Sequence, residues 1–362
     1  MKRKIVFYIG SLAKGGAERV FVNLAQYFKG LGYEVVIATK LVEKVEYEVP
    51  EGVVRIVVDI AGEEISKSRI VNFFRRLSKL RRTWKREKPD LVFTAIGKNN
   101  FMVIVSSLFM RHKVIGSVVS DPKREFCNFV MRFLAKTLFF LADGMVFQTE
   151  DAKSYFPKGI QKKSIILPNS INPAFIKERF EGTRKKEIVM VGRIDDNKNP
   201  QMLVEAFSYL AKEYPEWNVI LYGDGVGREK VERLIEEKSM GSRIVMAGSQ
   251  GDIQDKIYES SVYVLCSYVE GMPNALMEAM ALGLAVISTD CPCGGPRMLI
   301  ENYQNGILIP VGDSRRLQEA LREVLDNEEL RENMGRNASL LGSRLHPDKV
   351  NLMWKEYFES IM

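Results

Sequence analysis

The stretch from residue 262 to residue 297 constrains the fold of this chain most strongly. It holds two apolar runs, Val262 to Leu265 and Leu284 to Ser288, with helix-forming residues between them. Short apolar runs joined by a helical segment predict buried strands of an α/β sheet. The same alternation of strand and helix recurs along the chain, which favours doubly wound parallel sheets.

Two glutamates flank the start of the helix in this stretch. Glu270 lies in the loop after the first strand, and Glu278 follows after seven intervening residues, inside a helix expected from Pro273 to Ala281. Proline suits the first helical position, because its missing N–H would have no partner there. The N-terminal N–H groups of such a helix form an anion site beside Glu270. Taken alone, the pair also fits two solvated carboxylates on an ordinary strand–helix–strand unit.

The length of 362 residues favours two domains. A polar, charged run from residue 177 to 186 has the composition of a linker. We expect a first domain over residues 1–172 and a second over residues 173–346. The loop after the first strand, residues 10–16, lacks the GxGxxG spacing of a dinucleotide-binding fold, which weakens an NAD-binding interpretation.

The basic charge is concentrated in the first half of the chain. Residues 1–180 contain 32 Lys and Arg against 17 Asp and Glu, whereas the remainder contains 21 against 29. This asymmetry indicates an anionic partner for the first half, which we expect to be a membrane surface and not nucleic acid. The most basic segment, residues 67–88, has helical periodicity with one apolar face. One interpretation is that the apolar face packs on the sheet and the cations are only solvated. Another is that the cations hold the chain against anionic lipid, and both can be true at once.

No run of apolar residues is long enough to span a bilayer. The four cysteines lack paired CxxC spacing, so we expect no zinc site and a reducing compartment. These features predict a cytoplasmic protein, associated peripherally with the inner face of the membrane.

A second candidate group lies in the loop that precedes another predicted helix, residues 192–200. Arg193 and Lys198 are five residues apart there, so both cations can converge on one diphosphate. Two solvated cations would show the same spacing. Gly223 and Ser249 follow two further predicted strands, where open α/β sheets bind ligands.

Together these residues resemble the donor-site signature of the retaining group 1 glycosyltransferases of the GT-B fold. That family includes enzymes of capsule, O-antigen and lipid-linked oligosaccharide assembly. The matching features are the two glutamates with seven residues between them, the Met- and Ala-rich helix, the strand ending at Thr289-Asp290 and the helix start at Gly295-Pro296. The resemblance implies two Rossmann-like domains facing a central cleft, with the closing helix, residues 347–362, crossing back to the first domain.

The resemblance also implies roles for individual residues. The implied catalytic residues are Glu270, Arg193 and Lys198. The implied donor-binding residues are Gly16, Glu278, Gly271, Met272, Pro273, Asn274, Ala275, Ser249 and Gly223. On the acceptor side they are Asp121, Asn99, Asn100 and Lys98, where Asp121 substitutes for a histidine that many relatives carry near Val119.

The implied reaction is transfer of a hexose or N-acetylhexosamine from a UDP-sugar to a lipid-linked or glycan acceptor, with retention. The leaving phosphate takes the acceptor proton. No DxD motif occurs in the sequence, so no divalent metal or other cofactor is expected. Two alternatives stay open: a UDP-sugar epimerase of the GT-B fold, and a catalytically inactive partner subunit that binds nucleotide sugars.

Overall fold

The protein is described by a computed structural model covering residues 2–362. The chain divides into two compact units. Of the described residues, unit 1 comprises 2–169 and 350–362, and unit 2 comprises 170–349. These divisions fall within a few residues of the expected domain boundaries, and the last helix, α16 (Pro347–Ile361), lies mostly in unit 1.

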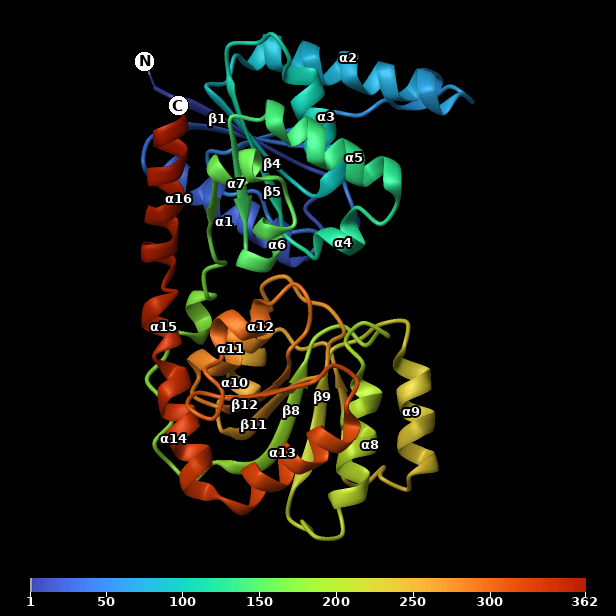
Figure 1. Ribbon diagram of the computed structural model, residues 1–362, viewed down its shortest axis with the longest axis vertical. Coiled ribbons are helices and arrows are strands. Elements are labelled where there is room, and N and C mark those ends of the chain that lie inside the picture. The colour runs from blue at the N-terminus through green and yellow to red at the C-terminus, as the bar shows by residue number, and fades with distance from the viewer. Residues whose placement is uncertain (1) are drawn as a thin grey trace. The chain divides into compact units, whose positions relative to one another are not determined.

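Unit 1 is built on one fully parallel sheet of seven strands (Figure 1), in the order β3-β2-β1-β4-β5-β6-β7. The central strand β1 (Lys4–Ile9) pairs with β2 (Glu34–Thr39) and with β4 (Leu91–Ala95). The other strands are β3 (Val54–Val57), β5 (Lys113–Val118), β6 (Gly144–Phe147) and β7 (Ser164–Ile166).

Helices cover both faces of this sheet because the side chains of each strand alternate between its faces. From β1, the ring of Phe7 packs edge-on against Phe21 of α1, whereas its neighbour Tyr8 packs against Trp84 of α2. The helices of unit 1 are α1 (Gly16–Gly30), α2 (Arg69–Glu87), α3 (Gly97–Ser107), α4 (Pro122–Glu125), α5 (Phe129–Leu138), α6 (Glu150–Ser154) and α7 (Lys158–Lys162), with 3-10 turns η1 (Gly62–Glu64) and η2 (Phe139–Leu141).

The C-terminal helix α16 belongs to unit 1 through an aromatic cluster. Phe358 stacks on Phe28 of α1, with ring centroids 5.2 Å apart and 13° between the planes. Trp354 packs edge-on against Phe93 of β4, also at 5.2 Å. Residues from the two ends of the chain therefore share one core.

Unit 2 contains a second fully parallel sheet, of six strands, in the order β10-β9-β8-β11-β12-β13. In each sheet the strand order reverses beside its first strand, between β1 and β4 and between β8 and β11. Ligands of such sheets bind at the carboxyl ends of the strands at this point. The strands are β8 (Lys185–Val191), β9 (Asn218–Tyr222), β10 (Ile244–Gly248), β11 (Ser260–Leu265), β12 (Ala285–Thr289) and β13 (Ile307–Ile309).

The core of unit 2 forms where Val262 and Val264 of β11 meet Phe207 of α8 and Leu321 of α13, all fully buried. The helices are α8 (Pro200–Leu210), α9 (Arg228–Glu237), α10 (Ile253–Lys256), α11 (Asn274–Ala281), α12 (Gly295–Leu299), α13 (Ser314–Asp326), α14 (Glu328–Ser339) and α15 (Leu341–Arg344), with a 3-10 turn η3 (Pro173–Phe175). The predicted α/β class, with two doubly wound Rossmann-like sheets, is confirmed.

One local prediction needs correction. Pro273 is the N-cap of α11 and not its first helical residue, because its ψ of 99° is extended. On the acceptor side, residues 97–100 form the first turn of α3, which begins at Gly97 directly after a bend at Ile96.

The basic helix α2 is buried along only part of its length. Leu80 and Trp84 are 1% exposed, whereas Ile70, Phe73 and Phe74 are 70%, 42% and 63% exposed. The predicted apolar face therefore packs into unit 1 in its C-terminal half and meets solvent in its N-terminal half. Over residues 2–362, every helix is too short or too polar to cross a bilayer.

Candidate functional site

Most of the predicted site residues of unit 2 lie at the carboxyl edge of its sheet. Arg193 follows β8, Gly223 follows β9, Ser249 follows β10 and Glu270 lies in the loop after β11. All these strands are parallel, so their carboxyl ends lie along the same edge. Segments up to 80 residues apart in the chain thus form one site.

The centre of this site is an ion pair between Lys198 and Glu270. The Nζ atom of Lys198 lies 2.6 Å from Oε1 of Glu270, and the two side chains are only 16% and 13% exposed. The backbone on both sides is fixed: the N–H of Tyr268 donates to the carbonyl of Asn197 at 2.8 Å, and the Asn197 amide donates to the carbonyl of Val269 at 3.0 Å. The charged atoms therefore meet because their two loops are bonded together.

A third loop closes against Glu270. The N–H of Glu270 donates to the carbonyl of Pro292, and the N–H of Cys293 donates to the carbonyl of Glu270. A side chain at Gly295 would place its Cβ only 1.7 Å from the carbonyl oxygen of Gly271. The Gly-Pro helix start seen in the sequence is thus required by the close approach of the two loops.

Glu278 lies inside α11 and is 7% exposed. It lies near the fully buried Tyr263 of β11: burial raises the pKa of that hydroxyl well above its usual value, and the charges of Glu270 and Glu278 raise it further. The Tyr263 hydroxyl therefore stays protonated near both carboxylates.

The start of α11 is the predicted anion site. Met272 and Pro273 are buried before it, and Asn274 and Ala275 form its first turn. Its N-cap residue, Pro273, makes no side-chain hydrogen bond to the helix, and the helix dipole gives the N-terminus a partial positive charge.

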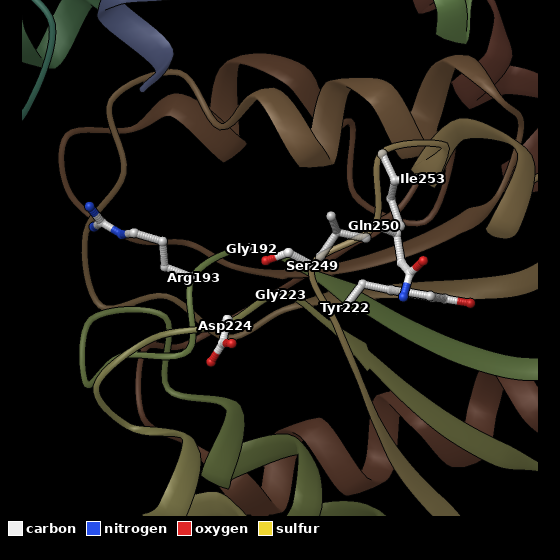
Figure 2. A pocket seen from close by; sticks show the side chains of 9 residues that line it. Gly192, Arg193, Tyr222, Gly223, Asp224, Ser249, Gln250 and Ile253 are labelled. Atoms are coloured by element: carbon white, nitrogen blue, oxygen red, sulfur yellow. The ribbon is translucent and has the colours of Figure 1, made fainter. Parts of the chain in front are cut away.

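Beside this centre lies a cavity of about 250 Å³ (Figure 2). Its walls include Arg193, Tyr222, Gly223, Ser249 and Gln250. Gly223 has φ of +134°, and a Cβ there would lie 1.8 Å from the carbonyl oxygen of Gly192. Only glycine lets the two strand ends approach so closely, which leaves room for a ligand above them.

Arg193 and Lys198 pair with different carboxylates of the protein. The Arg193 side chain is 75% exposed, and its Nε lies 3.1 Å from Oδ2 of Asp195. Figure 2 shows it extending away from Tyr222 and Gln250. Arg193 follows β8 directly and points outward, whereas Lys198 lies next to α8 and is held against the loop after β11. The two cations thus occupy different parts of the same edge.

The predicted residues of unit 1 lie at the carboxyl edge of the other sheet. Gly16 begins α1, Lys98 is exposed in the first turn of α3, and Asp121 caps α4 by accepting from the N–H of Lys123 at 3.0 Å. The amides of Asn99 and Asn100 donate to the carbonyls of Ala95 and Ser117, at 3.2 Å and 2.8 Å. Both asparagines are buried, so these bonds tie α3 to the strand ends.

Glu125 at this edge was missed by the sequence interpretation. Its Oε1 accepts a hydrogen bond from the N–H of Gly97, while its buried Oε2 has no hydrogen-bond partner. Desolvation raises the pKa of this carboxyl to about 7. The preceding Ile96 has φ of +72°, which is strained for a β-branched residue. The only hint in the sequence was the Asp121-Pro122 helix start three residues earlier.

No group of three or more His, Cys, Asp or Glu side chains that could hold a metal ion occurs among the residues that the structure describes. The four cysteines, all of them among the described residues, form no disulfide.

The fold and the site together define a glycosyltransferase of the GT-B class. Residues 172–340 match the family model for glycosyl transferases group 1, and residues 14–175 match the model for Glycosyltransferase Family 4. The two matches together span nearly the whole chain, which belongs to the group 1 glycosyltransferases. The family predicted from the sequence is confirmed.

The chain is similar to several bacterial transferases. It is 25% identical to the GalNAc-α-(1→4)-GalNAc-α-(1→3)-diNAcBac-PP-undecaprenol α-1,4-N-acetyl-D-galactosaminyltransferase of Campylobacter jejuni, with 92% of each chain covered. It is 25% identical to the UDP-Gal:α-D-GlcNAc-diphosphoundecaprenol α-1,3-galactosyltransferase of Escherichia coli, over 72% of this chain and 73% of the other. Among solved structures, HepE of Anabaena in complex with UDP has a TM-score of 0.83 at 16% identity, covering 99% of this chain and 100% of the other.

Proposed function

We propose that this chain transfers a hexose or N-acetylhexosamine from a UDP-sugar to a lipid-linked sugar or glycan acceptor, with retention of the anomeric configuration, in surface polysaccharide or glycoconjugate biosynthesis. The observation that carries the proposal is the shielded Lys198–Glu270 pair, with the start of α11 four residues further along the chain. A site for a diphosphate joined to a sugar needs a cationic group for the diphosphate and hydrogen-bond acceptors for the sugar hydroxyls.

Each part of the donor has a candidate partner in unit 2. The cavity beside Tyr222 and Ser249 receives the nucleotide base. The buried carboxylate of Glu278 accepts from the ribose hydroxyls, and Glu270 accepts from a hydroxyl of the donor sugar. Arg193, Lys198 and the first turn of α11 bind the diphosphate. HepE of Anabaena, a structural neighbour, binds UDP, which supports a uridine donor.

The chemical step requires little from the protein beyond positive charge. The acceptor oxygen forms a bond to the anomeric carbon on the face from which the diphosphate departs. The bond between that carbon and the phosphate oxygen breaks, its electron pair stays on the diphosphate, and the acceptor proton passes to a diphosphate oxygen. Lys198 and Arg193 stabilise the charge that develops there. With these cations supplying the charge, we expect turnover in the presence of EDTA.

The relatives favour a lipid-linked acceptor. The named substrates of the Campylobacter jejuni and Escherichia coli enzymes carry undecaprenol diphosphate. A lipid-linked acceptor lies at a membrane surface. The excess of Lys and Arg in the first half of this chain suits an anionic surface of that kind.

Helix α2 is the segment that we expect to contact the membrane. Ile70 and Phe74 are more than half exposed at its N-terminal half, and Arg82 and Lys85 are exposed further along. Apolar side chains that meet solvent beside cations are typical of helices that lie in the interface of a bilayer. On this proposal the chain works at the cytoplasmic face of the membrane.

The test is a turnover assay with a UDP-sugar panel and an undecaprenyl-diphosphate-linked sugar. We expect a glycosylated lipid whose new linkage has the anomeric configuration of the donor, as read by NMR. Release of an epimerised free sugar without acceptor would instead identify an epimerase. Binding of UDP-sugars without turnover on any acceptor would identify an inactive partner subunit.

A further inference from the structure

A second polar cavity in unit 2, of about 640 Å³, lies outside the candidate donor site. It lies between α8 and α9, which run side by side in Figure 1. Its walls include Asp196, Asn199, Gln201, Lys230, Arg233 and Tyr268. We refer to it as the α8–α9 pocket.

The charges of the α8–α9 pocket nearly cancel. Three carboxylates line it, Asp196, Glu205 and Glu237, against the two cations Lys230 and Arg233, and Lys230 lies 3.1 Å from Asp196. Amide groups of Asn199 and Gln201 and the 41% exposed ring of Tyr268 complete the wall. This combination suits a neutral ligand with many hydroxyl groups, because planar polar side chains bond the hydroxyls and an aromatic ring covers the apolar face of a sugar.

Gln201 points independently to a ligand. Both its Oε1 and its Nε2 are buried, and neither has a hydrogen-bond partner. A buried amide without partners costs stability, so such a group needs an explanation. Rotation of this amide toward the cavity would let the two hydroxyls of a vicinal diol satisfy it, one donating to Oε1 and the other accepting from Nε2.

The α8–α9 pocket shares a wall with the donor site. Asp196 and Asn199 belong to the loop that carries Lys198, and Tyr268 precedes Glu270 by two residues. The hydrogen bond from the N–H of Tyr268 to the carbonyl of Asn197 joins these two loops. A ligand that orders Tyr268 and Asn199 therefore acts on the loops that hold the Lys198–Glu270 pair.

We propose that the α8–α9 pocket binds a saccharide unit distinct from the donor sugar, and that its occupation changes the affinity of the donor site. This goes beyond the proposed transferase activity, since neither the binding nor the coupling requires turnover.

Binding is tested by saturation-transfer NMR on the full chain with free glucose, galactose, N-acetylglucosamine and N-acetylgalactosamine. Saturating UDP is present to fill the donor site. We expect signals from at least one sugar, and at least a tenfold weaker affinity in Gln201→Leu and in Tyr268→Ala. The matched control is Tyr209→Ala, which removes an exposed aromatic ring of α8 outside the pocket and leaves the signals unchanged. Absence of signals from all four sugars, or unchanged signals in Gln201→Leu, overturns the proposal.

Coupling is tested by calorimetric titration of UDP with and without the sugar that binds. We expect the sugar to change the Kd of UDP at least threefold in the wild-type chain and not in Gln201→Leu. An equal Kd in the presence and absence of the sugar overturns the coupling. Because no turnover is measured, failure here leaves the transferase assay unaffected, and an inactive chain can still bind the sugar.

Discussion

The ammonium group of Lys198 lies 2.6 Å from a carboxylate oxygen of Glu270, with both side chains largely shielded from water. A pair of this kind holds each partner in one orientation before a ligand arrives. It also keeps a single positive charge from being left unpaired in a shielded site, where it would be costly. The pair thus places the cation for a diphosphate and the carboxylate for a sugar hydroxyl side by side.

The first prediction concerns this cation. Lys198→Met removes a charge that stabilises the departing diphosphate, so we expect kcat/KM to fall by about 10²- to 10³-fold. The measurement is steady-state turnover of the UDP-sugar. The matched control is Lys186→Met, which removes the cation of an exposed pair with Glu216 in the same unit. A fall of less than about threefold in Lys198→Met would rule out this role.

The second prediction concerns the donor contacts of Glu278 and Arg193. Glu278→Ala and Arg193→Ala should each reduce kcat/KM by orders of magnitude, because each removes a group assigned to the ribose or the diphosphate. Circular dichroism should show an unchanged fold, since Arg193 is 75% exposed. Glu236→Ala, an exposed carboxylate of α9, serves as control. Full turnover in either of the first two variants would refute the site assignment.

The donor-site residues of unit 2 could be predicted from the sequence because the motifs that identify them are local. The seven-residue spacing of Glu270 and Glu278 and the Gly295-Pro296 helix start lie within one strand–helix–strand unit. The partner of Lys198 was not predictable, because Glu270 is 72 residues away and meets it only when β8 and β11 pair. Glu125 was missed for the same reason: its burial depends on Gly97, 28 residues earlier.

Helix α2 shows a further limit of sequence patterns. Its periodicity correctly predicted an amphipathic helix, but not that the fold would cover Trp84 and leave Phe74 exposed. Which part of a helix is buried depends on how the other elements of the fold pack against it, and a local pattern does not contain that information. The basic composition of this segment also suggests that Arg81 is a surface cation. In the structure its guanidinium group donates hydrogen bonds to the carbonyls of Ser106 and Leu108.

The third prediction tests membrane contact at α2. Cations near an anionic bilayer contribute about 1 kcal/mol each, so Arg82→Gln with Lys85→Gln should weaken binding to phosphatidylglycerol vesicles by about 30-fold. Phe74→Ser should also weaken binding to these vesicles. Because this variant removes an apolar contact and no charge, the loss should be the same at low and at high salt. Sedimentation with vesicles at two salt concentrations measures both effects.

The control for this experiment is the pair Lys238→Gln and Arg315→Gln in unit 2, which removes the same charge elsewhere. Arg76 and Arg81 are left intact because they bond to Asp59 and to backbone carbonyls. Equal vesicle binding by the wild type and the α2 variants would show that this helix does not contact the membrane.

The fourth prediction is a pH dependence of stability from Glu125. Desolvation raises the pKa of this carboxyl from 4.5 to about 7 in the folded chain. The folded state therefore binds this proton more tightly than the unfolded state does. The resulting stability is fully present below pH 4.5 and is lost as the pH rises through 7, by up to about 3 kcal/mol.

Glu125→Gln keeps the neutral form at every pH, so we expect it to flatten the fall in stability between pH 5 and pH 8. Urea unfolding at several pH values measures the slope. Replacement of the exposed Glu48 by Gln provides the comparison and should leave the slope as in the wild type. A slope in Glu125→Gln equal to that of the wild type would show that Glu125 ionises normally.

The fifth prediction concerns α16. Phe358 is fully buried and stacks on Phe28, so Phe358→Ala should destabilise unit 1 by about 3–5 kcal/mol. Trp84 and Trp354 lie in unit 1 and Trp217 in unit 2, so a Trp217→Phe background makes tryptophan fluorescence report on unit 1 alone. Leu352→Ala, at a 46% exposed position of the same helix, should cost less than about 1 kcal/mol. If the two alanine variants unfold at the same urea concentration, the C-terminal helix is not part of the core of unit 1.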